Sequence, residues 1–353
     1  MAQISNQCNC DQQRIAIAKY VSLLLALILL TNAVNAASDT QTENHSSNSF
    51  FSVQYENDLF VNKDHYYTSG IQLTMLNNEE APTWLKNIAQ WTPFYDESIN
   101  KRYVQYTFGQ KMFTPDNIKI KTLQVDDRPY AGYLYLSANL ISHTHHSQNI
   151  DYGNQFEITL GLVGPSALAK ETQAFAHSIS NSPIPQGWQN QLNDEITFGL
   201  SYSLLSRVIK PISDNLSYGY NQQVTMRIGN AYTYASLGAM YRLGDNLRQD
   251  LSPPNIHPGF PGLTYFKSTK KLNWYIFLGF EARLVGRNIF LDGNTFSDSH
   301  SVKKKPLIGD IQYGIVFIFD EMRIAISSTS RTKEYTTQKD FTNYGAINFA
   351  FYY

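Results

Sequence analysis

The chain has little cysteine and few long apolar runs. Its two cysteines, Cys8 and Cys10, both lie before the apolar stretch Val21–Leu30. The rest of the chain therefore has no disulfide, which excludes a disulfide-based scaffold. No later segment reaches the roughly 18 consecutive apolar residues that indicate a membrane-spanning helix. The net charge is −1, so neither acidic nor basic residues are in excess. The lack of excess positive charge argues against a nucleic-acid partner.

The first 36 residues have the pattern of a secretory signal. Arg14 and Lys19 precede the apolar stretch, and Val34 and Ala36 provide small residues three and one before a cleavage point. We expect a signal peptide at 1–36 and a mature chain at 37–353. An uncleaved membrane anchor is the alternative, but about ten strongly apolar residues are too few to span a bilayer.

Aromatic residues are abundant, with 24 Tyr and 20 Phe, although the mean hydropathy is slightly polar at −0.33. An exported chain with this composition is typical of an outer-membrane β-barrel. Only the outer face of such a barrel is apolar, and aromatic girdles mark both membrane interfaces.

Alternation of apolar and polar residues recurs along the mature chain and predicts β-strands. The last strand is the clearest, with Ile347, Phe349, Phe351 and Tyr353 alternating with small or polar residues. We predict an all-β fold, a twelve-stranded antiparallel transmembrane β-barrel in the bacterial outer membrane. A β-sandwich is the alternative, but so many strands with one apolar face exceed what two sheets need to bury. The predicted strands are 50–58, 67–77, 102–113, 130–142, 154–163, 195–207, 216–229, 232–243, 272–285, 306–319, 322–332 and 343–353.

An even number of strands places both chain ends on the periplasmic side. The connections 78–101 and 245–271 are then periplasmic; 83–91 could form a short helix, and no conformation is predicted for 245–271. The extracellular connections are 59–66, 114–129, 164–194, 286–305 and 333–342.

Polar residues gather where the first strand ends and the second begins. Alternation places Asp58 on the non-lipid face with Glu56, and counting back from Ile71 and Leu73 places Thr68 there too. Carboxylate and hydroxyl oxygens are the ligands that a hard cation such as Ca²⁺ prefers. A solvated hairpin tip is the alternative, because Asn and Asp are common in turns.

The connection 164–194 contains a helix-forming stretch, for which Pro165 and Ser166 suit the first positions. His177 falls in the last turns of this predicted helix, within possible reach of the barrel rim. A histidine titrates near neutral pH and can accept a proton from water, although a loop histidine with no function is the alternative. One stripe of the helix would carry Leu168, Thr172, Phe175 and Ile179.

Two further clusters carry weaker signals. The run His143–His146 resembles a metal-binding tract, but we expect it to be a polar periplasmic turn. Lys303–Lys305 could contact lipopolysaccharide phosphates or be a solvated run of charge. Ser178 and Ser180 lie just after His177 but would point away from it on a helix, so a serine nucleophile is not expected.

Several ordered motifs together resemble the outer-membrane lipid A 3'-O-deacylase (LpxR-like) family, and the resemblance spans most of the mature chain. The family is a twelve-stranded barrel whose members remove the 3'-linked acyloxyacyl chain of lipid A in a Ca²⁺-dependent hydrolysis. The motifs are YENDLF, DHYYTSG, DDRPYAGYLYL, LGLVGPSALAKETQAFAH and PQGWQNQL.

The resemblance implies roles for four residues of this chain. Asp58 would hold Ca²⁺, which polarises the ester carbonyl and stabilises the oxyanion. His177 would deprotonate the attacking water. Asn57 would orient the water, carbonyl or metal shell, although alternation gives it lipid-facing parity, and the Thr68 hydroxyl would complete the shell. The implied substrate is lipid A or lipopolysaccharide, reached from the outer membrane by a monomeric protein.

The chain departs from some relatives, which carry a glutamate about six residues after the histidine. Here Ser182-Pro183 occupies that place, so we expect either a weaker metal site or another ligand such as Glu56. Asp127 and Arg128 match a family Asp-Arg feature, in which Arg128 could grip a lipid phosphate or, as we favour, pair with Asp127. A phospholipid acyl hydrolase and a non-enzymatic pore or receptor remain alternative functions.

Overall fold

The computed structural model describes residues 49–58, 66–77, 81–91, 102–147, 149–180, 182–245, 247–253, 256, 266 and 272–352. The predicted signal peptide at 1–36 lies outside the described residues. Within these residues, no helix has the length and apolar character needed to cross a membrane.

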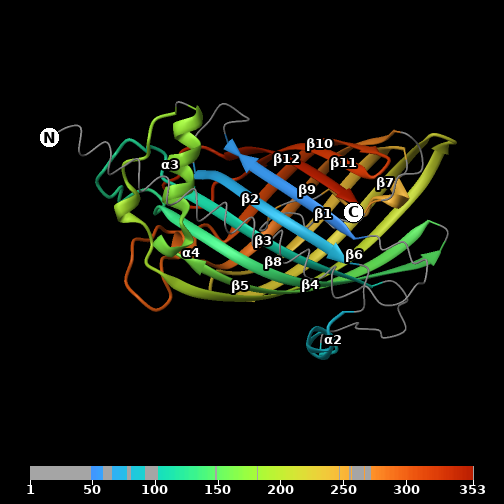
Figure 1. Cartoon of the computed structure of the whole chain (residues 1–353), viewed down its shortest axis with the longest axis horizontal. Helices are drawn as coiled ribbons and strands as arrows, with labels where there is room; N and C mark the ends of the chain where they lie inside the picture. The colour runs from blue at the N-terminus through green and yellow to red at the C-terminus, as the bar shows by residue number, and fades with distance from the viewer. Residues whose placement is uncertain are drawn as a thin grey trace, which may run out of the picture. The chain divides into compact units, whose positions relative to one another are not determined.

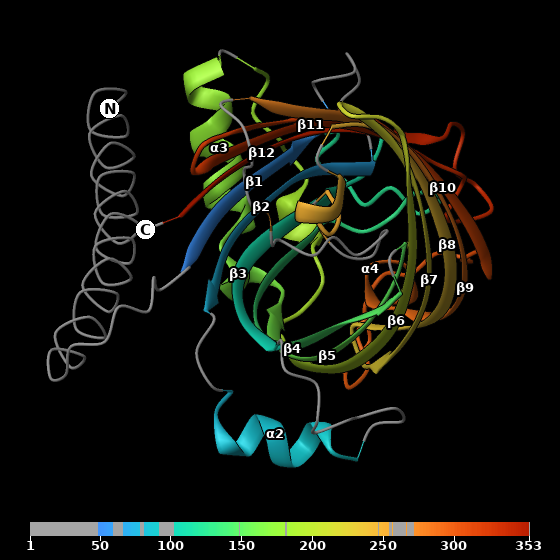
Figure 2. The ribbon, with the colours of Figure 1, turned by 90° about the vertical axis from the view of Figure 1, so that its right-hand side faces the viewer.

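Twelve antiparallel strands close into a barrel in which each strand pairs with its neighbours in sequence and β1 pairs with β12. Figure 2 shows the strands following one another around a ring, and Figure 1 shows the same barrel from the side. The predicted fold class is therefore confirmed. The strands are β1 (Phe50–Asn57), β2 (Tyr66–Asn77), β3 (Arg102–Thr114), β4 (Ala131–Ser147), β5 (Ile150–Val163), β6 (Glu195–Ser213), β7 (Leu216–Gly229), β8 (Tyr232–Gly244), β9 (Asn273–Asn288), β10 (Leu307–Phe319), β11 (Met322–Arg331) and β12 (Thr342–Tyr352).

The barrel closes in register between its first and last strands. Phe51 lies opposite Phe351, and Ser52 lies opposite Ala350. The first pair faces outwards and its rings lie 5.4 Å apart, whereas Ser52 and Ala350 are buried. Because side chains alternate between the two faces of a strand, this register keeps one face apolar around the whole circumference.

The outer face carries the apolar residues that alternation predicts. Phe198 on β6, Met226 on β7 and Leu237 on β8 are each more than 60% exposed. The luminal face of the same strands is polar and buried, with Ser201, Thr225 and many arginines among its residues. An apolar outer face and a polar interior are typical of outer-membrane barrels.

The predicted boundaries differ most from the structure in β4, β5 and β6. β4 runs to Ser147 and β5 begins at Ile150, so the prediction that His143–His146 form a turn is wrong. The strand pair continues through His143 opposite Gly153 and His145 opposite Asp151, and the His143 ring is buried 3.9 Å from the Asp151 carboxylate. β6 continues six residues beyond its predicted end at 207, to Ser213.

The connections contain short helices. The predicted helix near 83–91 is confirmed as α2 (Thr83–Ala89). The connection after β5 first forms the 3-10 helix η2 (Pro165–Ala167) and then α3 (Ala169–Ser180), separated by Leu168 in a left-handed conformation with φ 59°. Pro165 and Ser166 therefore begin the short turn and not the α-helix. The remaining helices are η3 (Trp188–Asn190), η4 (Leu247–Gln249) and α4 (Ile289–Asp292).

The described part of the β8–β9 connection is buried among luminal side chains. The Asp250 carboxylate accepts hydrogen bonds from Arg323 at 3.1 Å and from the Tyr275 hydroxyl at 3.0 Å. The Asp250 carbonyl accepts from Arg242 at 2.7 Å and Arg207 at 3.1 Å. One aspartate thus links side chains from β6, β8, β9 and β11.

The chain divides into two compact units. The barrel unit comprises 47–170 and 184–353, and the second unit includes 171–183. Each is described by itself below.

Candidate active site

The β1–β2 hairpin brings together two of the predicted site residues. The register pairs Asn57 with Ser69, so the next residue along β1, Asp58, falls opposite Thr68. Both residues are buried, with 0% of Asp58 and 3% of Thr68 exposed. The hairpin thus brings Asp58 and Thr68, which are ten residues apart in sequence, together at the rim that we expect to be extracellular.

Thr68 sits at a β-bulge. The pairing of β2 with β3 shifts between Tyr67 and Ser69, so the simple alternation that placed Thr68 does not hold there. Tyr67 turns into the lumen and its hydroxyl donates to Glu56 at 2.8 Å. The Thr68 hydroxyl instead lies 2.8 Å from the Thr114 hydroxyl, at the end of β3.

Thr114 was not predicted as a site residue. It is fully buried and places a second hydroxyl beside Thr68. The only signal in the sequence is its position at the end of the predicted strand, directly before Pro115. The pairing that brings it to Thr68 spans 46 residues.

Asn57 lies beside Asp58 but faces the other way. Its side-chain amide donates to the Tyr55 hydroxyl at 2.9 Å, and Tyr55 belongs to the outer face, where it is 38% exposed. The lipid-facing parity predicted for Asn57 therefore agrees with this hydrogen bond.

Glu56 is not placed as a substitute metal ligand. Its carboxylate already accepts hydrogen bonds from Gln54 at 2.8 Å, Tyr67 at 2.8 Å and the backbone amide of Ile256 at 3.0 Å. With three donors satisfied in the lumen, Glu56 supports the end of β1 from inside the barrel.

His177 lies in α3, in the unit that includes 171–183. Its ring Nδ1 is 2.7 Å from the carbonyl oxygen of Pro183, and the His177 carbonyl accepts from the backbone amide of Ser182 at 3.1 Å. A carbonyl can only accept, so Nδ1 is the donor and Nε2 is left as the basic nitrogen. Pro183, which replaces the glutamate of some relatives, thus orients the histidine through its backbone.

The oxygens at the rim fit a hard cation by their chemistry. Asp58 offers a carboxylate, and Thr68 and Thr114 offer hydroxyls, and Ca²⁺ accepts both kinds of ligand. Within the described residues, no three His, Cys, Asp or Glu side chains are close enough to form a metal site. A Ca²⁺ site here would therefore depend on one carboxylate and neutral oxygens.

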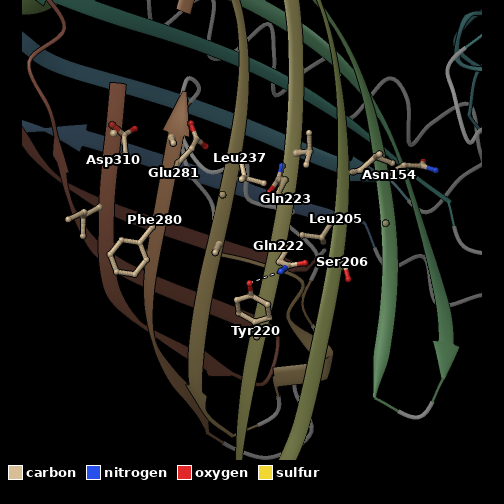
Figure 3. A pocket seen from close by; sticks show the side chains of 18 of the residues that line it. Asn154, Leu205, Ser206, Tyr220, Gln222, Gln223, Leu237, Phe280, Glu281 and Asp310 are labelled. Carbon is tan, nitrogen blue, oxygen red and sulfur yellow. Dashed lines mark hydrogen bonds between the residues drawn. The ribbon is translucent and has the colours of Figure 1, made fainter. Parts of the chain in front are cut away.

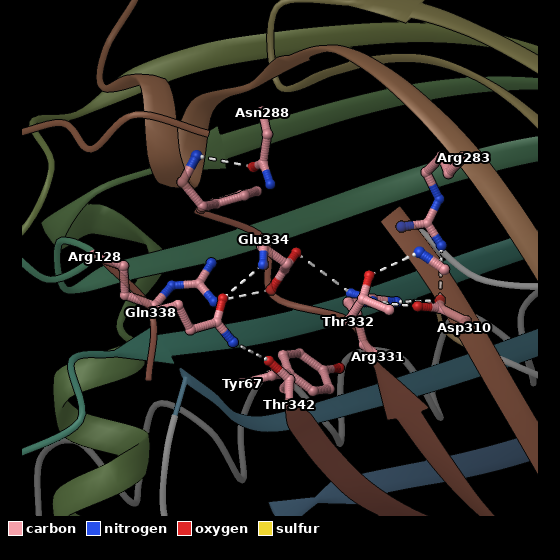
Figure 4. Close-up of polar contacts among 12 residues, drawn as sticks. Tyr67, Arg128, Arg283, Asn288, Asp310, Arg331, Thr332, Glu334, Gln338 and Thr342 are labelled. Atoms are coloured by element: carbon pink, nitrogen blue, oxygen red, sulfur yellow. Dashed lines mark hydrogen bonds and ion pairs between the residues drawn. The ribbon is translucent and has the colours of Figure 1, made fainter. Parts of the chain in front are cut away.

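Arg128 does not pair with the Asp127 side chain, which was the partner that we favoured from the sequence. Its guanidinium is buried and pairs with Glu334, from the connection between β11 and β12, at 3.4 Å (Figure 4). It also lies over the Phe113 ring, 4.7 Å from the centroid. The Asp127 carboxylate accepts instead from the backbone amides of Asp116 and Arg128, each at 2.7 Å. Arg128 therefore joins the β3–β4 connection to the β11–β12 connection.

A wide groove lies apart from these residues. It has a volume of about 1060 Å³ and is lined by residues from β4 to β11, such as Leu237, Phe280 and Gln222 (Figure 3). Leu237 and Phe280 lie on the lipid-facing side, 62% and 42% exposed. None of Asn57, Asp58 and Thr68 lines this groove, so it belongs to the barrel wall.

Lys303–Lys305 lies among the extracellular connections. Lys304 pairs with the Asp292 carboxylate at 2.7 Å, and the backbone amide of Lys305 donates to the Glu334 carbonyl at 2.7 Å. Lys303 is exposed. The run is thus mostly part of the loop structure.

Comparisons with known proteins identify the family. A structure of LpxR from Salmonella typhimurium superimposes with a TM-score of 0.70 at 18% sequence identity, covering 86% of this chain and 100% of that one. The β-domain of the Bordetella autotransporter BrkA gives 0.47 at 8% identity, covering 88% of this chain and 100% of that one. Comparison with curated proteins returned no significant match. The family model described as outer membrane protein LpxR matches residues 23–353, and the chain therefore belongs to the LpxR family of outer-membrane proteins.

Proposed function

We propose that the chain is a Ca²⁺-dependent hydrolase that removes the 3'-linked acyloxyacyl chain of lipid A in the outer leaflet. The observation that supports this most directly is the convergence of Asp58, Thr68 and Thr114 at the barrel rim, in a member of the LpxR family. Asn57 joins them from the outer face, the side from which a membrane lipid approaches.

The residues would divide the hydrolysis among them. The Nε2 nitrogen of His177 takes a proton from water as the water oxygen attacks the ester carbonyl. The bond between the carbonyl carbon and the sugar oxygen then breaks, and His177 passes its proton to the departing sugar oxygen. The hydrogen bond between Nδ1 and the Pro183 carbonyl supports this role, because in the neutral ring it places the proton on Nδ1 and the lone pair on Nε2.

Asp58 would hold the cation, with the Thr68 hydroxyl as a further ligand, and Asn57, which faces outwards, would orient the water or the ester carbonyl. When bound there, Ca²⁺ would supply positive charge to polarise the carbonyl and stabilise the oxyanion. The hydrogen bond between the Thr114 and Thr68 hydroxyls would orient the Thr68 oxygen. With Pro183 in place of the acid found in some relatives, we expect a weak Ca²⁺ site that requires a high concentration of the ion.

Mass spectrometry of lipid A from a test bacterium expressing the protein tests the proposal. The wild type should remove the acyloxyacyl mass with Ca²⁺ present and not with a chelator. His177→Ala and Asp58→Ala should abolish the loss, and Thr68→Val should slow it by roughly tenfold or more, since a hydrogen bond of about 1–3 kcal/mol is removed.

Asp298→Ala provides the matched control, because Asp298 is exposed in the β9–β10 connection and the variant should retain full activity. Unchanged lipid A with folded, membrane-inserted wild type would overturn the proposal. Release of fatty acid from phospholipids under the same conditions would assign the chain to phospholipid substrates instead.

A further inference from the structure

The helix α2 packs against the outside of the barrel (Figure 2). Buried residues of the segment 81–91 and three strand residues form one hydrophobic cluster, which contains Ala81, Leu85, Ala89, Val104, Leu140 and Phe156. The strand residues are neighbours across the wall, because Val104 pairs with Leu140 and Leu140 pairs with Phe156. The helix therefore covers a patch of β3, β4 and β5.

This patch is part of the lipid-facing surface. Leu136 on β4 pairs with Leu160 on β5, and they lie four residues along the strands from Leu140 and Phe156. Side chains alternate along a strand, so residues four positions apart share a face. Leu136 and Leu160 are 57% and 53% exposed, as expected for side chains that meet lipid on the outer face of a barrel. The helix thus lies where other outward-facing residues contact the membrane.

A second side of the segment is also apolar, but it is exposed. Trp84, Ile88 and Trp91 are spaced four and three residues apart, which places them in one stripe of a helix. The Trp91 amide donates to the Ile88 carbonyl at 3.2 Å, so Trp91 continues the last turn. The two tryptophans are 49% and 85% exposed, and the exposed polar residues Thr83 and Gln90 lie on another side. The wall therefore accounts for only one of the two apolar sides.

We propose that α2 anchors the barrel in the phospholipid leaflet at the end expected to be periplasmic, with Trp84, Ile88 and Trp91 inserted among the lipids. The stripe continues the lipid-facing surface on which α2 rests, so phospholipid is the partner that reaches it. Tryptophan suits this position because its ring prefers the boundary between acyl chains and headgroups, where the indole N–H finds an acceptor.

The anchor is separate from the proposed active site. The β2–β3 connection that contains α2 lies at the opposite end of the strands from the β1–β2 hairpin, which carries Asp58 and Thr68 (Figure 1). Lipid contact through α2 therefore does not depend on the hydrolysis of lipid A, and its absence would leave the proposed function unaffected.

Tryptophan fluorescence tests lipid contact directly in the full chain. The wild type and the double variant Trp84→Phe/Trp91→Phe are inserted into phosphatidylcholine nanodiscs whose acyl chains are either brominated or unbrominated. The difference in emission between the two proteins is the contribution of the two tryptophans. Bromine quenches an indole that it touches, so we expect brominated chains to remove more than half of this contribution and aqueous acrylamide to remove little of it.

Trp188→Phe is the matched control for this measurement. Trp188 is 3% exposed, in the connection between β5 and β6, so the emission that it contributes should be equal in the two lipids. Quenching of Trp84 and Trp91 by acrylamide and not by bromine would place α2 in water and overturn the proposal. Quenching by neither would mean that a protein surface, such as a second copy, covers the stripe, which also overturns it.

Proteolysis in unbrominated nanodiscs provides a second test that keeps both tryptophans. Cleavage by trypsin after Lys86 requires α2 to leave the membrane surface and unwind, and mass spectrometry measures its rate. Ile88→Asp places a charge in the stripe, where lipid disfavours it, and should speed this cleavage several-fold. Gln90→Asp adds the same charge on the exposed polar side and should cleave at the wild-type rate. Equal rates for the two variants would contradict the anchor.

Discussion

Asp250 shows how much one residue can organise in the lumen. It is fully buried and accepts hydrogen bonds from Arg207, Arg242 and Arg323 through its carbonyl and carboxylate. A carboxylate among guanidinium groups offsets their desolvation, and its removal leaves buried positive charge uncompensated.

We therefore expect Asp250→Ala to lower the free energy of unfolding by about 3–5 kcal/mol. Denaturant titration in detergent, followed by tryptophan fluorescence, measures this change. Asp214→Ala is the matched control, because Asp214 is exposed in the β6–β7 turn and its replacement should change the stability little. Equal stability of the two variants would show that the arginines do not depend on Asp250.

At the level of elements, the connection after β5 is shaped by one glycine. Gly164 has φ 108°, a conformation that side chains rarely adopt, and a Cβ there would lie 2.6 Å from the backbone of Asn193 and Asp194. The close approach joins the two ends of the 164–194 connection, where the Ser166 hydroxyl also donates to the Asp194 carboxylate at 2.7 Å.

Gly164→Ala should therefore displace this connection and cost roughly 1–3 kcal/mol of stability through backbone strain, with a fall in lipid A deacylation if 164–194 carries the catalytic histidine. Limited proteolysis of the connection and lipid A mass spectrometry provide the two measurements. At Gly309 an added Cβ would make only an ordinary contact, 3.5 Å from Thr332. Gly309→Ala should thus resemble the wild type, and an equal loss in both variants would argue against the strain.

For the whole molecule, the filled lumen bears on the pore alternative. Two charge clusters cross the interior, one around Asp250 and one in which Arg283 and Arg331 both bind Asp310 at 2.8 Å (Figure 4). A luminal cavity between β2 and β8 has room for about one water molecule. Within the described residues, this packing opposes a continuous aqueous path.

We expect the protein to show no steady ion conductance in planar bilayers. An established porin reconstituted in the same way controls for insertion, and heat-dependent mobility on gels confirms that the barrel is folded. Defined single-channel steps from the wild type would contradict the packing argument and support a pore.

The sequence by itself determined the twelve strands, the apolar outer face and the helices near 83 and 170. These features are local. A strand is recognised from the alternation of apolar and polar residues, and a helix from the residues of its own short segment. The same locality explains the wrong turn at His143–His146, where polar residues on the luminal face of a strand resemble a loop.

Only the tertiary structure decided which polar groups meet. Thr68 contacts Thr114 across 46 residues, Arg323 contacts Asp250 across 73, and Arg128 pairs with Glu334 across 206. Barrel register, a bulge at Thr68 and the burial of Asp250 create these pairs, and none of the three is a local property of sequence. Asp127, adjacent to Arg128 in the chain, was the obvious partner by sequence. The closed barrel brings Glu334 to the buried guanidinium instead, because the folded chain must satisfy each buried charge with whichever group the strands carry to it.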